Sequence, residues 1–283
     1  MARLTLSPTK LWDAWKEVAA TAETAAALVL AGDRELVERA RAVLAPDGGW
    51  IPTPAGGLAA LAGVAPAPGQ TLLVFVQPHE EDGAVAALRG AHLPQGAVVA
   101  VDDGPAATHQ VTWYHDRWGR VSFSDTDSGW RALGGAVLDA ADNRVIPLGR
   151  RYPGLRRQAA ARVIRRTARQ NGVIGAAFIL PGTDMPVMTL NQVKMVLSIA
   201  AIYGEEITAE RALELLGVVG AGFGFRALAR QALDFVPGPG WALKGAVGYT
   251  GTRALGEAAL RYFEQGAPAT PSRLASLARR LRR

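Results

Sequence analysis

The sequence contains no cysteine, which excludes disulfides, thiolate nucleophiles and cysteine-based metal sites. Lysine is scarce as well: four lysines stand among the 31 cationic residues, and the other 27 are arginine. The N-terminus lacks the apolar core of a signal peptide, because charged residues and tryptophans interrupt it from the start. We therefore expect the chain to begin in the cytoplasm.

Motifs of the common enzyme classes are absent too. There is no phosphate-binding loop GxxxxGK[ST], no nucleophile elbow GxSxG, no zinc motif HExxH, and no GxGxxG after a predicted strand. These absences favour a protein that is not an enzyme, and we expect no cofactor.

The first half of the chain has the pattern of an α/β domain. With 283 residues, 49% of them hydrophobic and 20% charged, the chain is folded and long enough for two domains. Short apolar runs separated by helical patterns predict a mostly parallel sheet that is covered on both faces. The predicted strands are 26–31, 71–76, 97–101 and Arg144–Leu148, with an added hairpin from 110–114 and 120–123. Helices are predicted over 34–44, 80–89 and 128–141, and a helix that begins near Pro8 is expected to pack through its tryptophans. This domain is predicted to span residues 1–149.

The segment 150–170 is predicted to be a basic connecting helix. Nine arginines and no acidic residue occur between positions 142 and 184. Four of them fall on one side of the predicted helix: Arg162, Arg165, Arg166 and Arg169. Two interpretations stay open, namely a face that is simply solvated and an amphipathic helix that lies on anionic lipid or on an acidic partner.

Residues 171–266 are apolar and rich in glycine, and they predict an all-α domain. Their longest charge-free run is thirteen residues and contains a Pro-Gly pair, so no segment is a clean membrane span, which needs about 20 apolar residues. Small residues recur along one helical face: Gly245, Gly248, Thr252 and Gly256. Such a stripe lets helices approach closely, either in a bundle that docks on or dips into a membrane or in a soluble bundle that forms oligomers. Asp184, which follows the Pro-Gly pair, is predicted to cap the next helix.

The tail, residues 267–283, is basic. Four arginines near its end predict a further contact with anionic lipid or a protein partner: Arg279, Arg280, Arg282 and Arg283. The tail has no aromatic residues that would stack on bases, so nucleic acid is not expected as a partner.

Several motifs in the second half resemble a bacterial family, the domain of unknown function 697. They are LPGTDMPVMTLNQVKMVLSIAAIYG, RALELLGVVGAGFGFRALAR and FVPGPGWALKGAVGYTGTRALGEAALRYFEQG, within about residues 169–266. That domain occurs in proteins associated with Era-like GTPases and in some inner-membrane proteins. The resemblance implies a helical module that is fused to, or works beside, a GTPase-like domain, and it implies no catalytic residues.

The order of elements in residues 1–149 is similar to that of an Era-like GTPase, but the chemical groups are missing. The first predicted strand leads into Gly32-Asp33 without a Gly-Lys-Ser/Thr sequence nearby. The third ends in Asp102-Asp103-Gly104, where a guanine-reading Asn-Lys-x-Asp would be expected. The resemblance therefore implies a degenerate GTPase-like domain without a phosphate-binding loop.

We expect a non-catalytic scaffold that acts at the inner face of the cell membrane or beside a GTPase partner. The alternative is a ligand- or metal-binding α/β enzyme that uses acids at strand ends, where α/β sheets usually bind ligands. These acids are Asp33, Asp102 and Asp103, and His79 is a further candidate ligand for a divalent metal.

Overall fold

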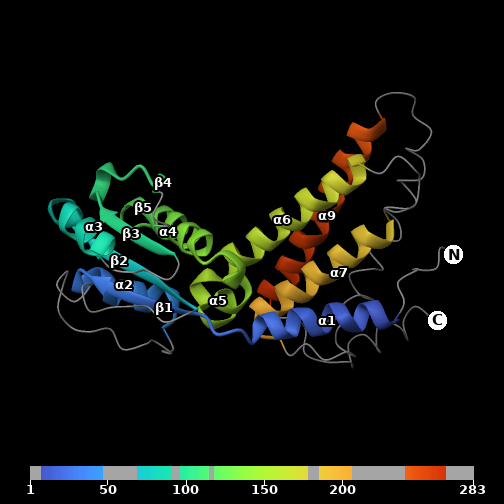
Figure 1. The fold of residues 1–283 in the computed structure, drawn as a ribbon, viewed down its shortest axis with the longest axis horizontal. Coiled ribbons are helices and arrows are strands. Elements are labelled where there is room, and N and C mark those ends of the chain that lie inside the picture. Colours follow the sequence, from blue (N-terminus) through green and yellow to red (C-terminus); the bar gives the residue numbers. More distant parts are fainter. Residues whose placement is uncertain are drawn as a thin grey trace.

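A computed structural model describes residues 8–46, 69–90, 96–114, 118–177, 185–205 and 240–265. The molecule is elongated, with a sheet and its helices at one end and an arm of long helices at the other (Figure 1). The α/β region is thus N-terminal and the helical region C-terminal, as the sequence predicts.

Five strands form a single, mostly parallel sheet. They are β1 Ala27–Gly32, β2 Gln70–Val76, β3 Ala97–Asp102, β4 Val111–Trp113 and β5 Trp118–Phe123. The order is β1-β2-β3-β5-β4, and only β4 is antiparallel, paired with β5 at the edge. The three predicted apolar strands and the edge hairpin are therefore confirmed.

Helices cover both faces of this sheet because its strands are apolar on both sides. On one face, α2 (Arg34–Leu44) and α4 (Asp127–Ala140) share a core with alternate strand residues such as Leu28, Leu30 and Phe75. On the other face, α3 (Glu81–Gly90) packs on Val29 and Val74, which point the opposite way. The predicted helices 34–44, 80–89 and 128–141 are confirmed.

The predicted strand Arg144–Leu148 is wrong. These residues lie in a short 3₁₀ turn, η4 (Asp142–Arg144), and in helix α5 (Val145–Arg151). Pro147 gives the reason, because a proline cannot donate to the ladder of a central strand but is tolerated in the first turn of a helix. Burial of Val145 and Leu148 in the core then outweighs the strand propensity of Val145 and Ile146.

Within the described residues, three long helices form the arm. They are α6 (Arg156–Ala177), which follows the turn η5 (Pro153–Leu155), α7 (Met185–Ile202) and α9 (Gly240–Glu264). The N-terminal helix α1 (Pro8–Ala22) lies along α7, where Val18 and Ala22 pack against Val193 and Leu197. The predicted packing of this helix is confirmed, and its partner is the arm.

One continuous core joins the sheet to the arm. Buried residues of the strands, of α5, and of α6, α7 and α9 belong to the same hydrophobic cluster. At the junction, the fully buried Tyr152 accepts a hydrogen bond from the backbone N–H of Leu28, with 2.7 Å between nitrogen and oxygen. Because β1 is an edge strand, this N–H has no strand partner, and the tyrosine supplies one. Burial raises the pKa of Tyr152, so the hydroxyl stays protonated.

No helix in the described part of the chain is both long enough and apolar enough to cross a membrane.

Tyr152→Phe is expected to lower the free energy of unfolding by about 1–3 kcal/mol, because it leaves the buried N–H of Leu28 without an acceptor. Tyr203→Phe is the control, since its hydroxyl makes only a long, 3.4 Å contact with Glu264 at the surface. Urea unfolding of both variants measures the difference. Equal losses for the two would contradict a special role for Tyr152.

Candidate functional site

The acids at the strand ends have structural partners. Asp33 follows β1 and caps α2: its Oδ1 accepts from the backbone N–H of Leu36 at 3.0 Å, and its Oδ2 accepts from Gln77 Nε2 at 3.3 Å. Asp102, at the end of β3, accepts from the backbone N–H of Gly104 at 3.1 Å. Both carboxylates thus stabilise the turns that follow their strands.

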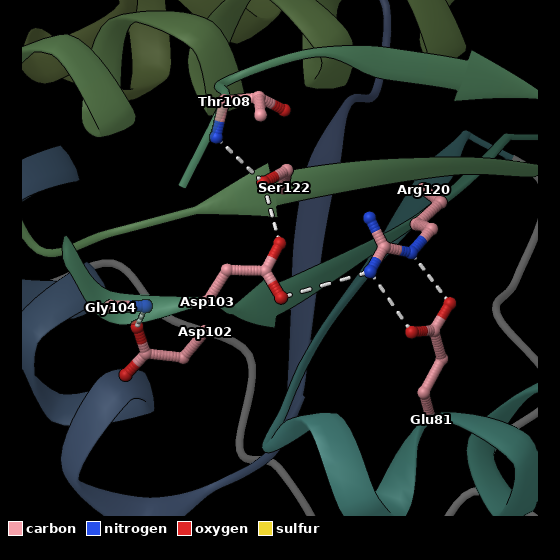
Figure 2. Close-up of polar contacts among 7 residues, drawn as sticks. All are labelled: Glu81, Asp102, Asp103, Gly104, Thr108, Arg120 and Ser122. Atoms are coloured by element: carbon pink, nitrogen blue, oxygen red, sulfur yellow. Dashed lines mark hydrogen bonds and ion pairs between the residues drawn. The ribbon is translucent and has the colours of Figure 1, made fainter. Parts of the chain in front are cut away.

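Asp103 belongs to a network that ties β3, β5 and α3 together (Figure 2). Ser122 Oγ donates to Asp103 Oδ2 at 2.5 Å and accepts from the backbone N–H of Thr108 at 3.0 Å. Arg120 binds Glu81 through two parallel bonds, from Nε at 2.6 Å and from Nη2 at 3.0 Å, and its Nη2 lies 3.8 Å from Asp103. The hydrogen bond to Glu81 raises the pKa of Arg120. Of the three acids that the sequence offered as ligands, Asp103 is thus held by Ser122 and lies near the charge of Arg120.

The hydroxyl groups near the end of β5 form a second chain of contacts. His109 Nε2 lies 2.9 Å from Ser124 Oγ, which lies 3.1 Å from Thr126 Oγ1. His109 has a left-handed backbone, with φ of 57°. A serine beside a histidine is the start of a nucleophilic site, but such a site needs a third group that orients the histidine. Within the described residues no carboxylate contacts His109, and Ser124 is buried, so these contacts hold the loop before β4 onto β5.

The candidate metal ligands of the alternative interpretation do not form a metal site. His79 is exposed on the turn η2 (Pro78–Glu80). In the described ranges, no group of three or more histidine or acidic residues is arranged to hold a metal ion.

Of the four arginines that were predicted to share one side of α6, one is ion-paired and three are exposed. Arg162 is half-buried and forms an ion pair with Asp139 of α4, and burial, together with the charges of Arg165 and Arg166, lowers its pKa. Arg165, Arg166 and Arg169 are exposed, and none of them has an ion pair with another described residue. The opposite side of the helix is buried, including Ala160, Ile164 and Thr167. Arg279, Arg280, Arg282, Arg283 and Asp184 lie outside the described residues.

The small residues of α9 face α6. A Cβ atom at Gly248 would lie 2.6 Å from the carbonyl oxygen of Asn171, and one at Gly256 would lie 2.6 Å from Ile164 Cγ1. At Gly245 it would lie 3.0 Å from the carbonyl oxygen of Gly172. The two backbones thus approach each other so closely that side chains do not fit between them.

A buried polar network crosses this helix contact. Asn171 of α6 is fully buried, and its Nδ2 donates to Thr252 Oγ1 at 3.0 Å and to the carbonyl oxygen of Met188 at 3.2 Å. Its Oδ1 accepts from Asn191 at 2.9 Å, and Gln192 donates to Thr252 at 3.0 Å. Sequence reasoning missed this network, although Thr252 and the Asn191-Gln192 pair stood in its motifs. The network fixes the register of α6, α7 and α9.

Gly248→Ala is expected to lower the free energy of unfolding by about 1–3 kcal/mol, because the new methyl group would meet the backbone of Asn171. Gly135→Ala is the matched control: it lies inside α4 with no atom within 4 Å of the new Cβ, and we expect a gain of about 0.5–1 kcal/mol. Thermal or urea unfolding compares the two, and the same sign for both would contradict the close helix contact.

Thr252→Val is expected to cost about 1–3 kcal/mol, because it keeps the shape of the side chain but removes the acceptor for Asn171 and Gln192. Thr250→Val, on the exposed side of the same helix, should change stability by less than about 0.5 kcal/mol. Unfolding of the two variants under one set of conditions tests this. A Thr252→Val protein as stable as Thr250→Val would show that the network does not stabilise the arm.

No curated protein and no solved structure is similar enough to the chain to count as a match. Residues 149–282 match the model of one family, the domain of unknown function DUF697. The match extends beyond the predicted 169–266 at both ends, so it includes the arginines of α6 and most of the basic tail. The predicted similarity of the C-terminal part of the chain to the DUF697 family is therefore confirmed.

Proposed function

We propose that the protein is a non-catalytic scaffold that attaches to an anionic membrane surface through the exposed arginines of α6. One observation carries this proposal. Three arginine side chains of α6 are exposed and have no acidic partner among the described residues: Arg165, Arg166 and Arg169. A guanidinium face of this kind attracts lipid phosphates and anionic head groups, at about 1 kcal/mol for each arginine near the surface.

A neighbouring apolar residue favours lipid over an acidic protein as the partner. Val173 follows Arg169 by one helical turn on the same side of α6, and 68% of its surface is exposed, although it is apolar. A basic cluster beside an exposed apolar side chain is the pattern of helices that lie in the interface between head groups and acyl chains. The proposed location is the cytoplasmic face of the cell membrane, where anionic lipids are found.

The rest of the structure supports association over catalysis. The strand-end acids Asp33, Asp102 and Asp103 are held by hydrogen bonds, which leaves the enzyme alternative with less support.

The relationship of the α/β region to Era-like GTPases stays a prediction. Two features speak against a nucleotide crevice beside β1: this strand lies at the sheet edge, and the predicted last strand is a helix. In doubly wound sheets the nucleotide sits where the strand order reverses, away from the edge.

An oligomer, if the protein forms one, would use another face than the glycine stripe. Gly245, Gly248 and Gly256 contact α6 within the same chain, so this surface is already covered. A GTPase or another acidic protein partner would compete with lipid for the arginine face of α6.

The proposal predicts that the full chain co-sediments with vesicles of 30% phosphatidylserine in phosphatidylcholine at physiological salt, and far less with phosphatidylcholine alone. Replacing Arg165, Arg166 and Arg169 together by Gln should weaken binding about a hundredfold, since three arginines contribute about 3 kcal/mol. The control replaces Arg34, Arg131 and Arg261, which are exposed elsewhere, and makes the same change in net charge.

Equal losses in the two triple variants would show nonspecific attraction by net charge and contradict the proposed face. An absence of binding to the anionic vesicles would contradict membrane attachment and leave the acidic protein partner as the occupant of the face.

A further inference from the structure

The two edges of the sheet differ in how they are covered. At β1, the hydroxyl of Tyr152 accepts the outward backbone N–H of Leu28. At the other edge, β4 has only β5 as a strand neighbour in the described part of the chain. Its sequence, Val-Thr-Trp, contains no proline and no charge, which are the residues that usually keep a further strand away from an edge. The edge at β4 is therefore open to pairing.

The pairing with β5 fixes which backbone groups of β4 point to the open edge. The N–H of Tyr114 donates to the carbonyl oxygen of Trp118 at 3.0 Å. Backbone directions alternate along an antiparallel strand, so Val111 and Trp113 turn their N–H and C=O groups away from β5. These groups lie at the outer side of β4, where no described strand pairs with them.

Exposed aromatic side chains flank this edge on both faces of the sheet. Trp113 is 44% exposed, and its ring lies over Gly119 of β5, where a Cβ atom would be only 2.9 Å from the ring atom Cζ3. Tyr114 follows on the opposite face, is 40% exposed and stacks on Trp118 with 4.2 Å between the ring centroids. Both rings are thus held in place by β5 while part of their surface stays exposed.

We propose that β4 pairs with β4 of a second copy of the chain, antiparallel and about a twofold axis at Thr112, so that the two sheets become one. In this register, Val111 of each copy lies opposite Trp113 of the other. Their outward N–H and C=O groups then form hydrogen-bonded pairs. Thr112 lies opposite itself.

The sequence of β4 favours a second copy over an unrelated strand, because it is complementary to itself in this register. Opposite residues share a face of the sheet, so each Trp113 ring comes to lie beside a valine, and threonine meets threonine. Aromatic with β-branched residues and threonine with threonine are favourable cross-strand pairs. The charge next to Thr112, on Arg120 of β5, is already bound by Glu81. The interface is separate from the arginine face of α6 and does not depend on membrane attachment.

A cross-link tests the register. The chain has no cysteine, so Thr112→Cys introduces a single thiol at an exposed position. The twofold axis places the Cα atoms of this residue about 4.5 Å apart in the two copies, a separation that a disulfide can bridge. Mild oxidation of the full chain should therefore give a covalent dimer. Thr250→Cys, exposed on α9, is the control and should stay monomeric under the same conditions.

A charge exchange tests the interface without a covalent bond. Sedimentation velocity of the wild-type chain should show a dimer whose share rises with concentration. Thr112→Lys and Thr112→Glu should each weaken the dimer about tenfold or more, because like charges meet at the axis. An equal mixture of the two variants should form the dimer again. The same two substitutions at Thr250 should leave the dimer unchanged.

A wild-type chain that stays monomeric at every concentration, together with no cross-link through Thr112→Cys, overturns the proposal and leaves a strand of another protein as the occupant of the edge. A dimer that persists in both Thr112→Lys and Thr112→Glu also overturns it. If a charged variant does not fold, the cross-link decides.

Discussion

The close approach of α6 and α9 is the constraint on which the helical arm depends. It requires glycine at positions 245, 248 and 256, because a Cβ atom there would lie within about 3 Å of α6. The approach brings Thr252 within hydrogen-bond distance of Asn171, so that a polar network can form where only apolar packing would be expected. With that side of α6 buried, Arg165, Arg166 and Arg169 lie on its exposed side. The surface that we propose as the attachment site is thus a consequence of how the interior of the arm is packed.

The junction between sheet and arm couples the packing of the long helices to that of the sheet. Helix α5 and Tyr152 belong to the same core as the strands and the long helices, and the tyrosine hydroxyl completes the edge of β1. The N-terminal helix packs on α7, far along the chain. The first helix of the chain therefore contributes to the arm, although the strands that follow it form the sheet.

Charge is distributed according to this architecture. At the carboxyl edge of the sheet, Arg120 pairs with Glu81 and lies 3.8 Å from Asp103, which also accepts a hydrogen bond from Ser122. On α6, Arg162 pairs with Asp139 and Arg157 lies 3.6 Å from Glu264, whereas Arg165, Arg166 and Arg169 have no ion pair with a described residue. Arg144 is buried, and its Nε and Nη2 atoms have no hydrogen-bond partner among the residues that the structure describes.

The sequence by itself determined the strands β1, β2 and β3, the edge hairpin, the helices α2, α3 and α4, and the arginine side of α6. Each follows from local periodicity, which a single segment carries. The similarity to the DUF697 family was likewise readable from motifs. Only the tertiary structure decided the secondary structure of residues 144–148. There, Pro147 and burial in the core outweighed the strand propensity of the β-branched residues. It also decided the hydrogen-bond partners of Asp103 and Asn171. Hydrogen bonds and ion pairs depend on which side chains from distant parts of the sequence come into contact. The periodicity within one segment does not determine these contacts.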